Sequence, residues 1–484
     1  MGCSQSMILD IETATTSASM SEGALITQER HQLKGALRMA VRIGIFLLML
    51  LIPGARNVAL IGLGIWAILG TRQAIQAMTL LTLLKFLNSA LYGSEGTSGL
   101  WMWFVLFIAA TRIYISAIVS RALRHPVLPK LLIFSTIVLF EAIFLSYYPA
   151  VSTFKLLSFL YVAAAILLAF RLNSQKSLDW SPWFVGMWIA VTVLSVPTLL
   201  VHEIGYFRDG EGFQGILFHP QTFAVFLAPG VAWLLGRTMF STEPTPVVLY
   251  TITAVALVFI YLTRARTAVV AIIASLIVIA LIAQFGKLNW RIALRRRFSH
   301  PLVIGLGFLG MASLFVTSFS GIVIEFALKN SDSGGISEAF EKSRGFSITE
   351  SWLNFVNNPL FGIGFGVSFA DYFMPVIEPV TGFPLSAPTE KGLLPIVVLE
   401  ETGIVGSVFF LLFLFVLIKY GLSYRKLAMP LMFLTCLFVN IGEMIFFSMG
   451  GLGLYIWLLI GWATSTQVDE VGADKPSHIY KLTP

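Results

Sequence analysis

The sequence predicts an all-α protein that crosses a membrane many times, and three observations support this fold class. Of its 484 residues, 57% are hydrophobic and 12% are charged, whereas a soluble globular protein has roughly 25% charged residues. About a dozen apolar stretches reach or approach the ~20 residues that a membrane-spanning helix needs. These stretches are continuous and do not alternate with polar residues, which argues against a transmembrane β-barrel.

The apolar stretches predict twelve to fourteen transmembrane helices within residues 36–317 and 393–464. The number is a range because the first two stretches are short and are separated by Pro53-Gly54. The expected spans cover residues 36–52, 56–70, 74–92, 99–118, 128–147, 154–171, 183–201, 216–236, 246–263, 267–285, 301–317, 393–418, 427–447 and 449–464.

The positions of Lys and Arg predict the orientation, because short cytoplasmic loops carry an excess of positive charge. Arg30, Lys34 and Arg38 flank the first span and place the N-terminus inside. Later clusters fall on the same side, at Arg121, Arg124 and Lys130, at Lys287, Arg291 and Arg295 to Arg297, and at Lys419, Arg425 and Lys426. Residues 1–35 and 465–484 are then polar cytoplasmic tails. Attraction to the anionic inner leaflet explains the net charge of +7, so no nucleic-acid partner is expected.

This orientation places the long stretch 318–392 on the outer face. Ser347 and Glu350 form a capping-box pattern that predicts a short helix. The helix has an apolar stripe, and a sequence that stops helices follows it. The stripe is Ile348, Trp352, Phe355 and Val356, and the stop is Asn357-Asn358-Pro359. The stripe predicts a helix that lies against the spans or the lipid interface.

Three glycines follow in LFGIGFG, at Gly362, Gly364 and Gly366. No strand precedes them, so they do not form a dinucleotide-binding fingerprint. A tight turn with close backbone packing is the favoured interpretation. Only two cysteines occur, Cys3 and Cys436, and no Cys/His metal spacing is present, so neither a structural disulfide nor a metal site is expected.

Arginines on the outer face are candidates for an anion site, because guanidinium groups match phosphate oxygens. Arg264 and Arg266 stand between the ninth and tenth spans; their spacing cannot put both on one helical face, and Arg266 is the preferred ligand. Contact with lipid headgroups is the alternative for the pair. Arg344 is a second candidate, unless it is a solvated loop charge. Lys155 opens the sixth span and either adds charge to the same mouth or contacts headgroups.

Among the possible bases, His219 stands before Pro220 and is either a helix-entry residue or a general base. Glu390 lies just before the twelfth span. Glu400 and Glu401 lie a few turns inside that span, either facing a polar cavity or bonded to loop backbone.

Arg112 lies within the fourth span. It is expected to face the interior or to pair with an acid such as Glu141 or Glu443, because an unpaired charge at membrane depth is costly.

Three stretches in this order resemble the O-antigen ligase and Wzy polymerase superfamily of bacterial envelope enzymes. HPQTFAVFLAPGVAWLL, from His219, is similar to the family's HPN-type span start. TRARTAVVAIIASLIVI, from Thr263, is similar to its SRTA-type span. The segment from Arg344 through Gly366, with EETGIVG ending at Gly406, resembles its conserved loop block. The resemblance covers roughly residues 215–410.

The resemblance implies a GT-C-like helical bundle in the bacterial inner membrane, with residues 318–392 in the periplasm. It implies a metal-independent, inverting glycosyltransferase that takes a glycan from an undecaprenyl-diphosphate carrier without a cofactor. Arg266 and Arg344 match the family's arginine positions and would hold the diphosphate. A flippase and a chain-length regulator are the partners it implies.

One departure from the ligase pattern is important. Ligases carry a His at the position of Gly392, which Leu393 follows here. Glu390 is the nearest group that can act as base, with His219 and Glu401 next. The missing His favours a repeat-unit polymerase for exopolysaccharide or O-antigen, while a ligase for lipid A core stays open. A lipid-linked oligosaccharide flippase is the alternative of another class, although the repeated halves of many transporters are not visible. A SEDS-class peptidoglycan polymerase is a further rival.

Overall fold

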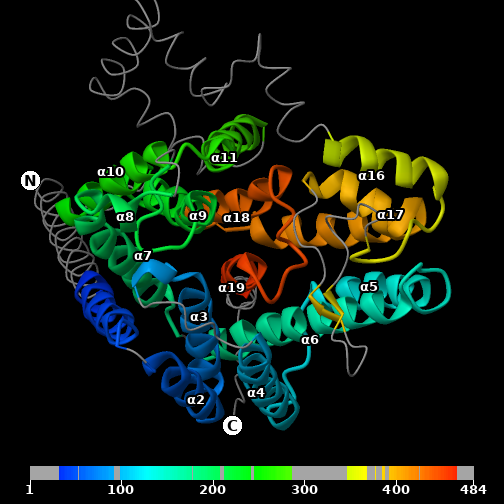
Figure 1. Ribbon diagram of the computed structural model, residues 1–484, viewed down its shortest axis with the longest axis horizontal. Helices are drawn as coiled ribbons and strands as arrows, with labels where there is room; N and C mark the ends of the chain where they lie inside the picture. The colour runs from blue at the N-terminus through cyan, green and yellow to red at the C-terminus, as the bar shows by residue number, and fades with distance from the viewer. Residues whose placement is uncertain are drawn as a thin grey trace, which may run out of the picture.

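The computed structural model describes most of the chain and leaves several segments out. The described residues are 32–52, 54–91, 99–176, 178–207, 212–240, 245–285, 346–367, 376–377, 384–386, 392–424 and 426–465. Within these ranges the protein is almost entirely helical (Figure 1). The strands found in them are β1 (Val376–Ile377) and β2 (Pro384–Ser386), which pair antiparallel.

Helices occur at most of the stretches that the sequence predicts to span. The first half contains a helix at residues 32–49, then α2 (Ala55–Ile68), α3 (Thr71–Phe86), η1 (Ser89–Leu91), α4 (Gly99–Val119), α5 (Leu128–Phe144), α6 (Pro149–Ser174), α7 (Ser181–Ser195), η2 (Pro197–Leu199) and α8 (His202–Gly205). The second half contains α9 (Pro220–Met239), α10 (Val247–Leu262), α11 (Arg266–Phe285), α16 (Phe346–Asn357), α17 (Leu394–Gly421), α18 (Ala428–Phe438), η5 (Val439–Ile441) and α19 (Leu452–Ser465).

Six helical segments of the described chain are long and apolar enough to cross a membrane: α4, α6, α7 together with η2, α9, α11 and α17. Shorter apolar helices are α2, α10, α18 with η5, and α19. The protein is therefore an all-α membrane protein. The total of twelve to fourteen spans stays a prediction, and the span expected at residues 301–317 lies outside the described residues.

The outer helices expose large apolar side chains, as expected for surfaces that face lipid. Val119 of α4 is 78% exposed, and Val58 of α2 is 70% exposed. Contiguous apolar surface of this kind is rare on soluble monomers. A bilayer provides the apolar environment that such faces require.

The centre of the bundle is α19, whose residues are all buried and which Figure 1 shows surrounded by the other helices. A helix that is apolar on every side belongs in a core. The indole N–H of Trp188 donates to the hydroxyl of Tyr455 at 2.7 Å. That hydroxyl donates to the carbonyl of Phe226 at 2.9 Å. These bonds tie α7 and α9 to α19 and satisfy the polar atoms buried between them.

The short helix α16 ends at Asn357, as the sequence predicts, but it begins at Phe346. Ser347 therefore lies in the first turn of the helix, and the capping box stays a prediction. The helix packs against α17. It leaves Trp352 49% exposed and Val356 53% exposed, so part of its apolar stripe lies open on the surface of the bundle.

Candidate functional site

A loop before α17 inserts its backbone into a break in that helix. Gly403 has φ 59° and ψ −163°, a conformation that suits glycine and interrupts the helical ladder. The N–H of Ile404 donates to the carbonyl of Pro359 at 2.8 Å. The N–H of Val405 donates to the carbonyl of Leu360 at 3.1 Å. Two amides that the break leaves without helical partners are thus bonded to the loop.

The same loop supplies donors to the carbonyls on the other side of the break. The N–H of Ile363 donates to the Glu400 carbonyl at 2.9 Å, and the N–H of Gly364 donates to the Glu401 carbonyl at 3.1 Å. A helix interrupted at membrane depth requires this compensation, because lipid offers no hydrogen bonds.

The glycines of LFGIGFG make this insertion possible. Gly362, Gly364 and Gly366 have φ values of 68°, 115° and 77°, a region that side-chain-bearing residues rarely adopt. A Cβ at Gly362 would lie 2.5 Å from the Glu400 carbonyl oxygen, and one at Gly366 would lie 2.1 Å from Cδ of Lys155. The predicted close backbone packing is confirmed.

Lys155 and Glu401 form an ion pair beside this loop. Nζ of Lys155 lies 3.9 Å from Oε1 of Glu401, and the two side chains are 10% and 1% exposed. The other carboxylate oxygen of Glu401 accepts the N–H of Gly366 at 2.7 Å. The ammonium also lies 5.5 Å from the ring centroid of Phe365, within cation–π range. Lys155 therefore joins α6, the loop and α17.

Glu400 holds the other side of the loop. It is 1% exposed, and its Oε1 accepts a hydrogen bond from Nδ2 of Asn354 in α16 at 2.7 Å. The hydroxyl of Tyr147 donates to Oδ1 of Asn358 at 3.3 Å. Glu401 thus binds the loop backbone, which was one of the two alternatives that the sequence left open, whereas Glu400 binds a side chain of α16.

His219 caps α9. Its Nδ1 accepts the backbone N–H of Gln221 at 3.2 Å, and its ring meets that of Phe207 edge-on with 4.8 Å between centroids. A neutral imidazole that accepts at Nδ1 carries its proton on Nε2. The structure places His219 as a helix-entry residue, and a role as base would require Nδ1 to give up this bond.

The start of α9 is linked to the segment that follows η5. Nε2 of Gln221 donates to Oε1 of Glu443 at 2.7 Å, and Glu443 is 5% exposed. A Cβ on the neighbouring Gly442 would lie 2.5 Å from Oγ1 of Thr267. The starts of α9 and α11 therefore meet at this segment.

The two arginines that the sequence predicts on the outer face differ in their surroundings. Arg264 is exposed and has φ 55°, outside the regions that most residues occupy. Arg266 is the first residue of α11 and is half-buried, next to the Thr267 that approaches Gly442. The structure thus gives Arg266 the more enclosed position, at the junction of α9 and α11.

Aromatic rings connect this junction to the ion pair. The ring of Phe447, four residues after Glu443, lies 5.0 Å from that of Phe365 and 5.0 Å from that of Phe159. Lys155 lies over the same Phe365 ring. The α6 ion pair and the start of α9 are therefore parts of one end of the bundle.

Two predicted residues, Glu390 and Arg344, lie outside the described residues. Their roles as base and diphosphate ligand therefore remain predictions. Gly392, where ligases carry a His, is described and has φ 101°. Because that conformation disfavours any side chain, the backbone here suits the glycine that this sequence carries.

Arg112 has neither of the acidic partners that the sequence offered. Its Nε donates to the carbonyl of Ile68 at 2.7 Å, and its Nη1 donates to Oγ of Ser116 at 2.6 Å. Ile68 ends α2, so the cation lies at the negative end of a helix dipole. The dipole and two hydrogen bonds compensate the charge.

Three polar groups of this end of the bundle were not predicted as site residues from the sequence. Asn354 and Gln221 carry no pattern that distinguishes them from ordinary amide side chains. Glu141 was named only as a possible partner of Arg112. Glu141 is 2% exposed, and its carboxylate oxygens have no hydrogen-bond partner in the described part of the chain. A Cβ on Gly406 would lie 3.1 Å from one of these oxygens. An acidic residue within an apolar helix marks a candidate functional site, and this signal could have identified Glu141.

The fold and this arrangement define an integral-membrane protein in which buried acidic residues of α5, α17 and the segment after η5 lie with Lys155 at one end of a helical bundle. No protein-family model matches the chain, and no curated protein matches its sequence.

Proposed function

We propose that the protein is a metal-independent, inverting glycosyltransferase with a GT-C-like fold in the bacterial inner membrane. Its reaction joins undecaprenyl-diphosphate-linked oligosaccharide repeats at the periplasmic face, as in a Wzy-type polymerase of exopolysaccharide or O-antigen. Both termini are cytoplasmic in this proposal.

One observation carries the proposal: the three stretches that resemble the superfamily meet at one end of the bundle. The start of α9 at His219 and the start of α11 at Arg266 meet at the segment around Glu443. The loop block meets the same segment through the Phe365–Phe447 contact. These stretches are separate in the sequence, and their convergence at one segment supports a shared site.

The chemistry fits these residue types. The hydroxyl oxygen of the acceptor sugar attacks the anomeric carbon of the donor glycan as the bond from that carbon to the diphosphate oxygen breaks. The undecaprenyl diphosphate leaves with the bonding electrons, and arginine side chains stabilise its charge. A general base takes the hydroxyl proton. Arg266 and Arg344 are the proposed diphosphate ligands, and Glu390 is the proposed base.

In the described part of the site, the Lys155–Glu401 pair positions the helices around the reaction. Lys155 is paired with Glu401 and lies under the loop, so its charge holds α6 and α17 together before any anion binds. A diphosphate that reached Lys155 would compete with Glu401. We therefore assign the direct phosphate contacts to the arginines and a positioning role to the Lys155–Glu401 pair.

The test is reconstitution of the purified protein in proteoliposomes with an undecaprenyl-diphosphate oligosaccharide, followed by separation of the products by size. A ladder of glycans on the lipid carrier is the expected result. Arg266→Ala, Arg344→Ala and Glu390→Gln should each lose activity, whereas Arg124→Ala, an exposed arginine on the predicted cytoplasmic side, should keep it.

Other outcomes identify the alternatives. A single transfer to added lipid A core, without a ladder, identifies a ligase. Movement of the intact lipid-linked oligosaccharide across the bilayer without a new glycosidic bond identifies a flippase, and either result overturns the polymerase proposal. Full activity in both arginine variants would remove the diphosphate assignment.

A further inference from the structure

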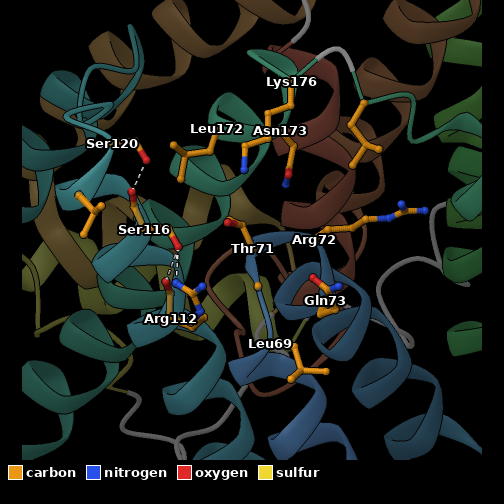
Figure 2. A pocket seen from close by; sticks show the side chains of 13 residues that line it. Leu69, Thr71, Arg72, Gln73, Arg112, Ser116, Ser120, Leu172, Asn173 and Lys176 are labelled. Atoms are coloured by element: carbon orange, nitrogen blue, oxygen red, sulfur yellow. Dashed lines mark hydrogen bonds between the residues drawn. The ribbon is translucent and has the colours of Figure 1, made fainter.

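A polar pocket lies at the opposite end of α6 from the Lys155–Glu401 pair. It has a volume of about 640 Å³. Its walls come from the turn between α2 and α3, the last two turns of α4, and the end of α6 with the residues that follow it (Figure 2). Lys155 and Asn173, on one helix, are separated by about 27 Å at a rise of 1.5 Å per residue. The two polar regions therefore lie at the two faces of a bilayer-thick bundle.

The pocket is positively charged. Arg72, Arg112 and Lys176 line it, and none of its described lining residues is Asp or Glu. Hydrogen bonds to Ile68 and Ser116 fix the Arg112 guanidinium. In Figure 2 the Lys176 side chain points into the pocket, whereas the guanidinium of Arg72 extends to its side. Like charges around a recess with low-dielectric walls attract an anion.

Neutral donors face the same space. The N-cap of α3 is Gly70, and no side chain caps this helix start. Gly70 and Thr71 line the pocket, so the positive end of the helix dipole lies at its wall. Asn173 is 3% exposed, and its Nδ2 has no hydrogen-bond partner within the described residues. Figure 2 shows the Asn173 amide pointing into the pocket above Thr71. A buried amide without a partner is uncommon, and it indicates a missing acceptor.

The rim of the pocket is apolar and open. Leu69 and Val119 belong to its lining, and they are 62% and 78% exposed. Ile65 of α2 and Ile115 of α4, one turn away from them, are 60% and 51% exposed. The basic recess thus opens beside helix faces that meet lipid chains, which is the arrangement that an anion with attached acyl chains requires.

We propose that this pocket binds the phosphate of an acidic phospholipid, with the headgroup between Lys176, Asn173 and the start of α3. The acyl chains then lie along the exposed faces of α2 and α4. Basic pockets between transmembrane helices on the cytoplasmic side are suited to anionic headgroups, and the orientation predicted from Lys and Arg places this pocket there. A free phosphate ion would meet the same donors, but it would not use the apolar rim.

The experiment compares the apparent melting temperature of the full-length protein in nanodiscs of phosphatidylcholine with that in nanodiscs containing phosphatidylglycerol. Native mass spectrometry of the protein released from each counts the lipids that stay bound. We expect phosphatidylglycerol to raise the melting temperature and to stay bound. Lys176→Gln and Asn173→Ala should each lower the shift and the retained lipid, and Arg112→Gln should lower them further.

The matched control is Lys130→Gln, an exposed lysine on the same predicted face that does not line the pocket. It should keep the full effect of phosphatidylglycerol. If phosphatidylglycerol shifts the melting temperature equally in all the variants, the proposal is overturned. Inorganic phosphate that reproduces the whole shift in phosphatidylcholine also overturns it, because the site then binds a free anion. Arg112→Gln also removes the bond to the Ile68 carbonyl, so the exposed Lys176→Gln variant decides the result.

Discussion

Lys155 of α6 and Glu401 of α17 lie 3.9 Å apart beneath a glycine-rich loop, in which a Cβ at Gly366 would meet the Lys155 side chain. The pair joins two helices that are distant in sequence at the end of the bundle where the predicted site lies. Its side chains are nearly excluded from solvent, so its contribution differs from that of a surface ion pair, which is worth little.

Loss of both partners of this pair should cost less stability than the sum of the two single losses. Lys155→Met leaves the buried Glu401 carboxylate without its nearby cation, and breaking a buried pair costs about 3–5 kcal/mol. Glu401→Gln should also destabilise the protein. The double variant should lose less than the sum of the two, measured as apparent melting temperature in detergent. Strictly additive losses would show that the two charges are not coupled.

The break in α17 should depend on glycine at position 403. Gly403→Ala places a Cβ 2.4 Å from the Leu360 carbonyl at a φ that alanine tolerates poorly, so the loop must move away. We expect a loss of several kcal/mol in stability, since strain and lost hydrogen bonds add together. Thermal unfolding measures the loss of stability, and the transferase assay measures the effect of the displaced loop on activity.

The control for this variant is Gly44→Ala in the helix at residues 32–49. A Cβ there meets nothing within 4 Å, and alanine is favoured over glycine in a helix by about 1 kcal/mol. Gly44→Ala should therefore be neutral or stabilising. A Gly403→Ala protein as stable as this control would contradict the close approach of the loop.

The two outer-face arginines should differ in importance if the proposed function is right. Arg266 is half-buried at the helix junction, whereas Arg264 is exposed. Loss of one charged hydrogen-bonding group from a phosphate site costs roughly 1.5–3 kcal/mol, which is about 10- to 150-fold in rate. Arg266→Ala should show that loss in kcat/KM for the lipid-linked donor, and Arg264→Ala should lose less. The reverse order would assign the anion contact to Arg264.

His125 should make stability depend on pH. It lies in the loop between α4 and α5 and is 2% exposed; burial, with the charge of Arg171 adding to it, lowers the pKa of His125 to about 3. The unfolded chain binds a proton near pH 6.5, whereas the folded chain does not, so this contribution is complete above pH 6.5 and is lost as the pH falls toward 3. At pH 5 the loss is about 2 kcal/mol.

The measurement is apparent melting temperature between pH 7.5 and 5. His125→Asn keeps an acceptor for the Val127 amide, which His125 Nδ1 binds at 3.3 Å, and it removes the titrating ring. Its melting temperature should fall less with acid than that of the unsubstituted protein. Parallel curves for the two proteins would exclude His125 as the origin of the pH dependence.

The sequence predicted the helices well because hydrophobicity alone determines which segments a bilayer accepts. It placed the end of α16 at Asn357 through Asn357-Asn358-Pro359, and it predicted the close packing of LFGIGFG. Both predictions rest on local sequence, because proline and glycine restrict or extend the backbone conformations at their own positions.

The contacts of the site could not be predicted in the same way. The partner of Glu400 is Asn354 and that of Glu401 is Lys155, and nothing in a sequence fixes which side chains meet across helices. Arg112 illustrates the reason, because its charge is compensated by the backbone carbonyl of Ile68. Every α-helix ends with such carbonyls, so the sequence does not show which one an arginine binds.

The exchange of hydrogen bonds at Gly403 also links the biogenesis of the protein to the assembly of its site. A continuous α17 would bond Ile404 to Glu400 and Val405 to Glu401, whereas the docked loop replaces those two bonds with four. The loop precedes α17 in the chain and is therefore synthesised before the helix on which it docks. The docked loop thus completes the backbone hydrogen bonding of α17 and closes the acidic end of the bundle with the same four bonds.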